Sequence, residues 1–151
     1  MNSTPLRAVM DASVAVKVFV PESHSAEARE LMARFTQEDD SELVVPDLFF
    51  IECANVFWKW VQRSGYPFGQ VQEHLHDLGG LGFTVLPTQF LADDALGIAL
   101  KHKVTAYDAC YIAAAAKLGL PLITADEKLV KQVEKGGYDI QWLGSMPLAK
   151  G

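Results

Sequence analysis

Residues 118–129 read LGLPLITADEKL, and their pattern is the clearest indication of the fold class. An alanine-rich helical segment runs into Gly119, a short apolar run follows Pro121, and a new helical pattern begins after Asp126. A short apolar run between two helical segments is typical of a strand in a parallel sheet, because parallel strands need helical connections between them. The stretch therefore predicts an α/β fold.

Short apolar runs alternate with longer helical segments along the rest of the chain, which is the pattern of successive βαβ units. Turn-forming Gly and Pro residues separate the segments. We expect strands near residues 6–10, 43–45, 83–86, 120–124 and 140–143. We expect helices at residues 14–20, 25–35, 48–64, 68–78, 89–102, 108–118 and 127–134. The pattern predicts a five-stranded parallel sheet flanked by helices, in one domain spanning residues 1–151.

The composition is that of an ordinary globular protein, with 50% hydrophobic and 21% charged residues. No apolar stretch approaches the ~20 residues that a membrane-spanning helix needs, and the N-terminus lacks a signal-peptide pattern. We therefore expect a cytoplasmic protein with no membrane partner. Cys53 and Cys110 fall in predicted helices without metal-ligand spacing, so we expect reduced thiols in the core.

The formal net charge of −6 argues against a protein that coats nucleic acid through a basic surface. It does not argue against a nuclease, because bound divalent cations change the local charge that a phosphate meets.

Four acidic residues stand close to the ends of apolar runs: Asp11, Glu52, Asp108 and Asp126. The ends of parallel strands converge at the carboxyl edge of a sheet, so the fold can bring these acids together. Two carboxylates ~5 Å apart repel by roughly 3 kcal/mol at an effective dielectric constant of ~20, so a cluster needs a proton or a cation. Carboxylate oxygens suit Mg²⁺ or Mn²⁺, which position phosphate groups and activate water. The four acids predict a metal-dependent enzyme.

Three of these acids are also explained by helix capping. Asp11 precedes a predicted helix, and Asp126 precedes another. Asp108 is the fourth residue of Thr105-Ala-Tyr-Asp, which matches a capping box in which Thr105 caps the helix. Taken singly, capping explains each aspartate as well as a site does; the shared sheet edge favours the site.

Glu52 lies within a helical segment, 48–64, that carries apolar residues on more than one face. Such a helix is expected to be buried on most sides or packed against a partner chain. Asn55 and Lys59 follow Glu52 at i+3 and i+7, so the three share one face. The alternative is a solvated surface stripe, but the apolar flanks favour a functional carboxylate with Lys59 as a candidate phosphate contact.

Other function classes have weaker support. The chain has no phosphate-binding P-loop, no dinucleotide fingerprint and no esterase nucleophile elbow. His74 and His76 form an isolated H-x-H, which is more often a surface feature than a metal site. A phospho-acceptor signalling domain would need paired acids after the first strand and a lysine after the last strand, and the chain has neither. A purely structural, partner-binding domain would not need all four acids.

The four acids lie in four blocks of sequence: Asp11-Ala12-Ser13, PDLFFIECAN at 46–55, TAYDA at 105–109 and LGLPLITADEKL at 118–129. In this order and with these flanks, the blocks resemble the PIN domain, in particular the VapC-type toxins of bacterial toxin–antitoxin pairs. The resemblance covers about residues 7–143. Two features depart from it: Cys110 occupies a commonly small position, and helix 48–64 is unusually rich in Phe and Trp.

The resemblance implies an endoribonuclease that depends on Mg²⁺ or Mn²⁺ and leaves 5′-phosphate and 3′-hydroxyl ends. It implies a homodimer and an antitoxin that blocks the site. The metal-binding and catalytic residues would be Asp11, Glu52, Asp108 and Asp126. The supporting polar residues would be Ser13, Asn55, Thr105 and Thr124. A PIN-like nuclease in RNA processing or DNA repair would share these features, so that alternative stays open.

Overall fold

A computed structural model describes residues 4–147 of the chain and shows the predicted α/β class. Five strands form one sheet in the order β3-β2-β1-β4-β5, and every neighbouring pair is parallel. The strands are β1 (Arg7–Met10), β2 (Glu42–Pro46), β3 (Thr84–Leu86), β4 (Leu122–Thr124) and β5 (Ile140–Trp142). The prediction of a five-stranded parallel sheet is confirmed.

The helices follow the predicted order. The α-helices are α1 (Ala12–Ala15), α2 (Ser25–Gln37), α3 (Leu48–Ser64), α4 (Phe68–Gly79), α5 (Ala92–His102), α6 (Ala106–Leu118) and α7 (Glu127–Val133). Short 3-10 segments are η1 (Val16–Val18), η2 (Thr88–Phe90), η3 (Glu134–Gly136) and η4 (Leu143–Ser145).

The first predicted helix, 14–20, is the least accurate of these predictions. Its α-helical part starts at Ala12 and ends at Ala15, and η1 then tightens the chain to Val18. Valines alternate along this segment, and their branched side chains lower helix propensity just before Pro21.

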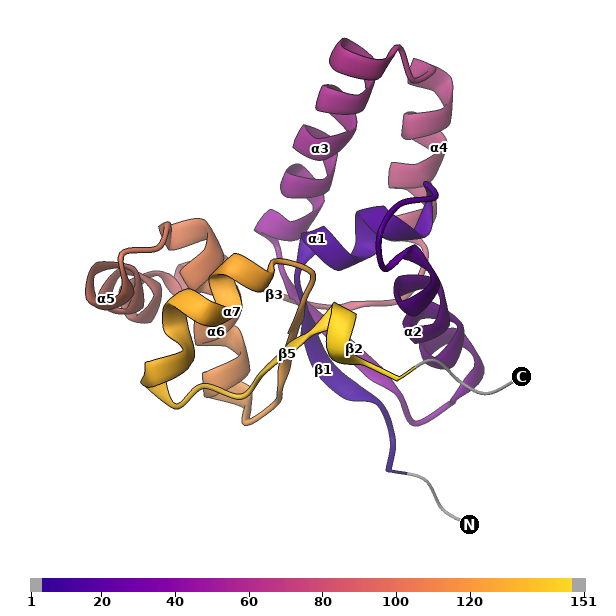
Figure 1. The fold of residues 1–151 in the computed structure, drawn as a ribbon. Coiled ribbons are helices and arrows are strands. Elements are labelled where there is room, and N and C mark those ends of the chain that lie inside the picture. Colours follow the sequence, from indigo (N-terminus) through magenta and orange to yellow (C-terminus); the bar gives the residue numbers. More distant parts are fainter. Residues whose placement is uncertain (1–3, 148–151) are drawn as a thin grey trace.

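The helices cover both faces of the sheet. Figure 1 shows α5, α6 and α7 on one side and α2 on the other. Helix α6 contacts β1, β2 and β4, and its residues from Ala109 to Ala115 are all buried. Because α6 is buried on all sides, it is apolar around its circumference instead of amphipathic. Its small alanine side chains let it lie close to the sheet.

Helices α3 and α4 project together beyond the carboxyl ends of the strands (Figure 1). Helix α3 buries Phe49, Cys53 and Phe57 but leaves Ile51 73% and Trp58 57% exposed. Burial on most sides was one of two expected outcomes, and it does not hold within one chain. Packing against a partner chain stays a prediction.

Helices α3 and α6, which carry Glu52 and Asp108, both end at a glycine with a left-handed backbone conformation. Gly65 (φ 64°) follows α3 and Gly119 (φ 66°) follows α6. Glycine adopts this conformation without steric cost and satisfies the last carbonyl groups of a helix. Both turns therefore follow directly from the sequence.

The strand order places a crevice at one edge of the sheet. After β1 the chain moves to β2 and β3 on one side, and later it crosses to β4 and β5 on the other. Ligands of open α/β sheets bind where the order reverses, at the carboxyl ends of the strands. That point lies between β1 and β4, directly before Asp11 and Asp126. Among the described residues, no helix is long and apolar enough to cross a bilayer.

Candidate active site

A cavity of about 750 Å³ lies at the carboxyl ends of β1 and β4. All four predicted acids line it, although they come from four separate segments of the chain. The lining residues include Asp11, Ser13, Glu52, Asn55, Lys59, Asp108 and Asp126. The structure thus brings together seven of the nine residues selected from the sequence, and the other two, Thr105 and Thr124, support members of this set.

Asp11 is held at the end of β1 by two hydroxyl groups. Its Oδ2 accepts hydrogen bonds from Thr124 Oγ1 at 2.7 Å and Ser13 Oγ at 3.0 Å. Burial raises the pKa of Asp11, and these hydrogen bonds partly oppose the shift. Its side chain does not cap α1, so capping does not explain this residue.

The same hydroxyl groups fix the loop that follows β4. Ser13 Oγ accepts a hydrogen bond from the Ala125 amide at 3.0 Å, and Thr124 Oγ1 accepts one from the Asp126 amide at 3.1 Å. The loop carrying Asp126 is therefore tied to the same two side chains that hold Asp11.

Asp126 has two roles in the geometry. Its Oδ1 accepts a hydrogen bond from the Leu129 amide at 3.0 Å, so Asp126 is the N-cap of α7, as the capping alternative predicts. The same carboxylate lines the cavity. A carboxylate has two oxygens, so capping α7 and facing the cavity are compatible.

Asp108 stands in the first turn of α6, whose N-cap is Thr105. Thr105 Oγ1 accepts a hydrogen bond from the Asp108 amide at 3.1 Å. The cap therefore uses the backbone of Asp108 and leaves its carboxylate at the cavity. Burial and the charges of Asp11 and Asp126 raise the pKa of Asp108 to about 6. Thr105 is exposed and supports the site only by starting α6 correctly.

Glu52 reaches the cavity from α3, and Asn55 and Lys59 line the cavity from the same helix, as their spacing predicts. Burial, followed by the charges of Asp11 and Asp108, raises the pKa of Glu52 to about 7. Its Oε1 is buried and has no hydrogen-bond partner among residues 4–147. Such an orphaned oxygen is costly unless a donor or a cation compensates it.

The donor set fits a hard divalent cation. It offers carboxylate oxygens from four segments of the chain at one cavity, and the charges of neighbouring acids add to burial in raising the pKa of Glu52 and Asp108. Within residues 4–147, no three Asp, Glu, His or Cys side chains lie close enough to ligate one ion together. Mg²⁺ keeps several water ligands and takes only one or two carboxylates directly, so four acids around a cavity can share one ion through its water molecules.

Two neighbours of these acids were missed in the sequence. Ile51 and Tyr107 line the cavity and are 73% and 66% exposed. Each directly precedes an acid, but adjacent residues on a helix point about 100° apart, so spacing alone does not place both at one site. The H-x-H pair has a different outcome: His74 Nε2 lies 2.8 Å from the Tyr66 hydroxyl and its ring stacks on Phe19, which is a structural role.

Cys53 and Cys110 are both buried and free, as expected for core thiols.

Comparisons with known proteins agree with this geometry. Residues 8–135 match the PIN domain family. The chain is 34% identical over 130 residues to ribonuclease VapC3 of Pyrobaculum aerophilum, which covers 84% of this chain and 95% of that protein. It is 30% identical over 102 residues to exonuclease VapC9 of the same organism, covering 68% and 74%.

Solved structures show the same fold. A protein of Pyrobaculum aerophilum matches with a TM-score of 0.63 and 23% identity, over 85% of this chain and 87% of that one. A toxin–antitoxin complex from Klebsiella pneumoniae matches with a TM-score of 0.59 and 17% identity, over 90% and 97%. The chain belongs to the PIN-domain family, within which it is similar to the VapC nucleases.

Proposed function

We propose that this protein is an endoribonuclease that depends on Mg²⁺ or Mn²⁺. The observation that carries the proposal is the convergence of Asp11, Glu52, Asp108 and Asp126 on one cavity of a PIN domain. Two proteins to which it is similar are named a ribonuclease and an exonuclease, which supports a nuclease.

The four carboxylates would hold the cation, directly or through its water ligands, and the bound cation would activate a water molecule and stabilise charge on the phosphate. Ser13 and Thr124 orient Asp11 through their hydroxyl groups. Thr105 supports Asp108 by capping α6. We assign Asn55 a supporting polar role because it lines the cavity beside Glu52.

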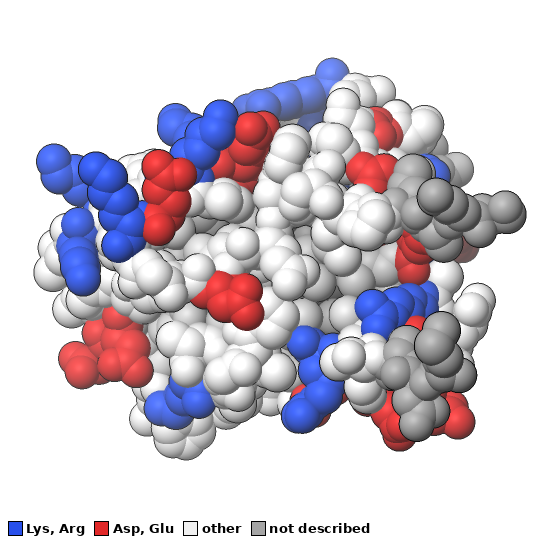
Figure 2. Space-filling model, turned by 60° about the horizontal axis from the view of Figure 1, so that its bottom comes forward, with Lys and Arg blue, Asp and Glu red and all other residues white. Residues whose placement is uncertain are grey.

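RNA is the proposed substrate, and Lys59 is the proposed phosphate contact. Lys59 lines the cavity, and no ion pair within residues 4–147 involves its ammonium group. On the face shown in Figure 2, Lys and Arg side chains lie among Asp and Glu and form no continuous basic surface. That face is turned away from the cavity, but the formal net charge of the whole chain is −6, so binding would depend on the cavity and its cations more than on a basic surface.

Substitution Asp11→Asn tests the proposal. An amide is a poor ligand for a hard cation. We expect RNA cleavage to fall roughly 100-fold or more, because the loss of even an outer partner of a metal ligand costs 10–100-fold. The amide oxygen can still accept from Thr124 and Ser13, so the fold should persist.

The matched control is Asp40→Asn, an exposed acid in a surface turn, which should cleave like the wild type. Cleavage is measured on single-stranded RNA and single-stranded DNA with Mg²⁺, with Mn²⁺ and with excess EDTA. Full activity in EDTA, or in Asp11→Asn, would refute the metal mechanism. Cleavage of DNA alone would favour the DNA-repair alternative.

We further propose that the protein acts in the cytoplasm as the toxin of a toxin–antitoxin pair, with an antitoxin that covers the cavity. Its similarity to the VapC nucleases supports this role. Expression of the wild type should arrest growth, and co-expression of the protein encoded beside it should restore growth. Growth unaffected by the active enzyme would favour the RNA-processing alternative.

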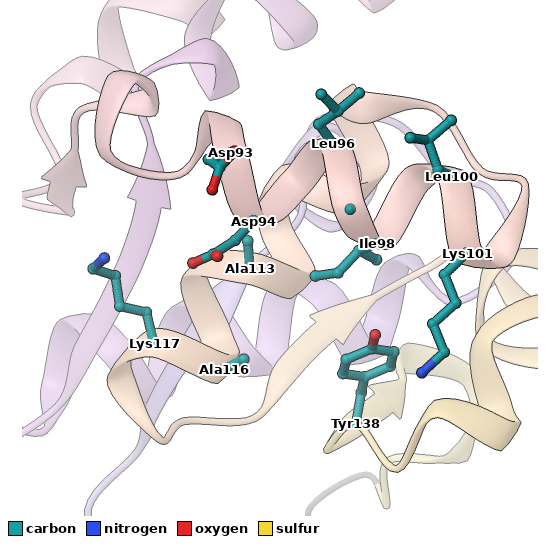
Figure 3. A pocket seen from close by; sticks show the side chains of 11 residues that line it. Asp93, Asp94, Leu96, Ile98, Leu100, Lys101, Ala113, Ala116, Lys117 and Tyr138 are labelled. Atoms are coloured by element: carbon teal, nitrogen blue, oxygen red, sulfur yellow. The ribbon is translucent and has the colours of Figure 1, made fainter.

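We also propose a homodimer, and the structure favours a surface on α5 for its interface. A hollow of about 730 Å³ lies beside α5 and α6 (Figure 3). Leu96 and Leu100 project from α5 and are 54% and 74% exposed. Gly97 stands between them in an open position, since an added Cβ would meet no atom within 4 Å. A glycine inside a helix is destabilising, so an approaching helix would explain it better than packing within the chain.

The charges of this α5 surface, Asp93 and Lys101, are complementary to the same charges on a second copy of the chain. Asp93, Gly97 and Lys101 follow one another at intervals of four residues, so they lie on one face of the helix. If two α5 helices pack antiparallel across a two-fold axis at Gly97, Asp93 of each copy faces Lys101 of the other. A two-fold interface requires this kind of self-complementarity.

A further inference from the structure

Two buried polar atoms without partners belong to neighbouring side chains. Among residues 4–147, the buried side-chain atoms with no hydrogen-bond partner are Glu52 Oε1, the Tyr111 hydroxyl and Trp142 Nε1. Trp142 lies on β5 and packs against His24. The other two are neighbours: burial raises the pKa of the Glu52 carboxyl, the Tyr111 hydroxyl partly opposes that rise, and neither buried atom has a hydrogen-bond partner in this structure.

Tyr111 approaches Glu52 from the protein interior. It lies on α6 three residues after Asp108, hence on the same side of the helix and one turn further along. Its side chain is 1% exposed and is one of the largest fully buried side chains of the chain. It does not line the cavity itself. The tyrosine ring therefore belongs to the core, while its hydroxyl reaches a residue of the site.

Packing explains the ring of Tyr111 but not its hydroxyl. A buried hydroxyl without a partner destabilises a fold, and phenylalanine would fill nearly the same space without that penalty. The nearby polar group is a carboxylate, which accepts hydrogen bonds strongly. The pairing of an orphaned donor with an orphaned acceptor indicates a shared role.

We propose that Tyr111 is a positioning residue, whose hydroxyl donates a hydrogen bond to the Glu52 carboxylate and orients it toward the divalent cation. The proposal rests on the metal site of the proposed function. A carboxylate that ligates a cation through one oxygen keeps its other oxygen for a hydrogen bond, and such outer partners fix the direction of the ligand. Tyr111 thereby couples the core of α6 to a side chain of α3.

Substitution Tyr111→Phe tests the proposal with minimal disturbance of packing. We expect Mn²⁺ affinity, measured by titration calorimetry, to fall 10–100-fold. At limiting Mn²⁺ the kcat for RNA should fall, saturating Mn²⁺ should restore it, and KM for RNA should not change. The matched control is Tyr66→Phe, which also removes one hydroxyl that contacts another side chain, here His74, but is not part of the cavity. It should bind Mn²⁺ like the wild type.

A double-mutant cycle with Glu52→Gln separates positioning from a general structural effect. In the Glu52→Gln background, Tyr111→Phe should cause no further loss of Mn²⁺ affinity, because the two residues act as one unit. The same fold-loss in both backgrounds would overturn the proposal, and so would equal affinities of Tyr111→Phe and the wild type. A wild-type protein that binds no Mn²⁺ would instead overturn the metal site and the proposed function with it.

Discussion

Asp108 and Asp94 occupy the same place in two different helices. Each is the third residue of its helix, α6 for Asp108 and α5 for Asp94, so each meets a similar helix dipole. Only Asp108 lines the carboxylate cavity. The two residues therefore separate the effect of a clustered charge from the effect of a charge at a helix start.

Neutralising Asp108 should stabilise the protein in EDTA. Asp108→Asn removes one repulsive charge, which relieves roughly 1–3 kcal/mol, while the Thr105 cap remains because it uses the Asp108 amide. Asp94→Asn should instead lose about 0.3–1 kcal/mol of helix-dipole stabilisation. Melting curves in EDTA measure both changes. Added Mn²⁺ should raise the melting temperature of the wild type more than that of Asp108→Asn, since only the intact site binds the ion tightly.

The gain from Asp108→Asn should depend on pH with a defined sign. The pKa of Asp108 is about 6 in the folded chain and near 3.8 when unfolded, so the folded state holds more protons between these values. The free energy of unfolding of the wild type therefore falls as pH rises through this window, and the variant lacks this contribution. The difference in melting temperature should be small at pH 4 and largest above pH 7. A difference that does not vary with pH would contradict the clustered charge.

The loop between β4 and α7 both starts a helix and contributes a residue to the cavity. Asp126 caps α7 with one oxygen and lines the cavity, while its amide is held by Thr124. A cap and a ligand make different demands, because serine can cap a helix but cannot supply a carboxylate.

Three substitutions at Asp126 should separate these demands. Asp126→Ala should cost about 0.5–2 kcal/mol of stability through the lost cap. Asp126→Ser should keep most of that stability and still lose Mn²⁺ affinity and RNA cleavage. Asp126→Glu, as a third variant, keeps the charge but places it one methylene further out. Denaturant unfolding measures the cap and calorimetry measures the ion. Asp126→Ser with wild-type cleavage would show that this residue is a cap alone.

The parts of the candidate site that could be predicted from the sequence are those that follow from hydrophobic periodicity and from turn-forming Gly and Pro residues. Strand ends, glycine turns and the spacing of Glu52, Asn55 and Lys59 lead to one sheet edge, and the structure places them there. The hydrogen bond between Ser13 and Thr124 and the proximity of Tyr111 to Glu52 were not predictable in the same way. They join residues that are far apart along the chain, and a single sequence contains no distances between such residues.

Several large apolar side chains are exposed across the molecule, among them Phe68, Phe90 and Tyr107, and two pairs of them each share one helix. One comprises Ile51 and Trp58 on α3, and the other comprises Leu96 and Leu100 on α5. Exposed apolar patches of this kind mark interfaces. Only the first surface is evident from the sequence, because helix 48–64 is unusually rich in Phe and Trp.

Charge reversal should test the proposed α5 interface. Lys101→Asp places an acid against Asp93 of the other copy, so the dimer should weaken, and Asp93→Lys in the same chain should restore it. Each exposed charge pair contributes only about 0.2–1 kcal/mol, so a two-fold interface with two pairs should lose roughly 2–30-fold in affinity. Sedimentation velocity over a range of concentrations measures the change. Lys135→Asp, on η3, is the control. An unchanged dimer, or one lost only in Trp58→Ala, would assign the interface elsewhere.

The projecting pair of helices has a consequence for how the molecule opens. Beyond the sheet, α3 and α4 are joined by an aromatic cluster of Phe57, Trp60, Tyr66 and His74, and α3 continues inward to Glu52. Local opening of proteins occurs in cooperative units, and units with few contacts to the rest open first. The outer turns of this pair should therefore exchange their amide hydrogens well before the strands do. Glu52 lies on the same helix, so binding of Mn²⁺ at the carboxylate cavity should slow amide exchange in the outer turns of α3 and α4. The exchange rate of these outer turns would then show whether the cavity holds Mn²⁺.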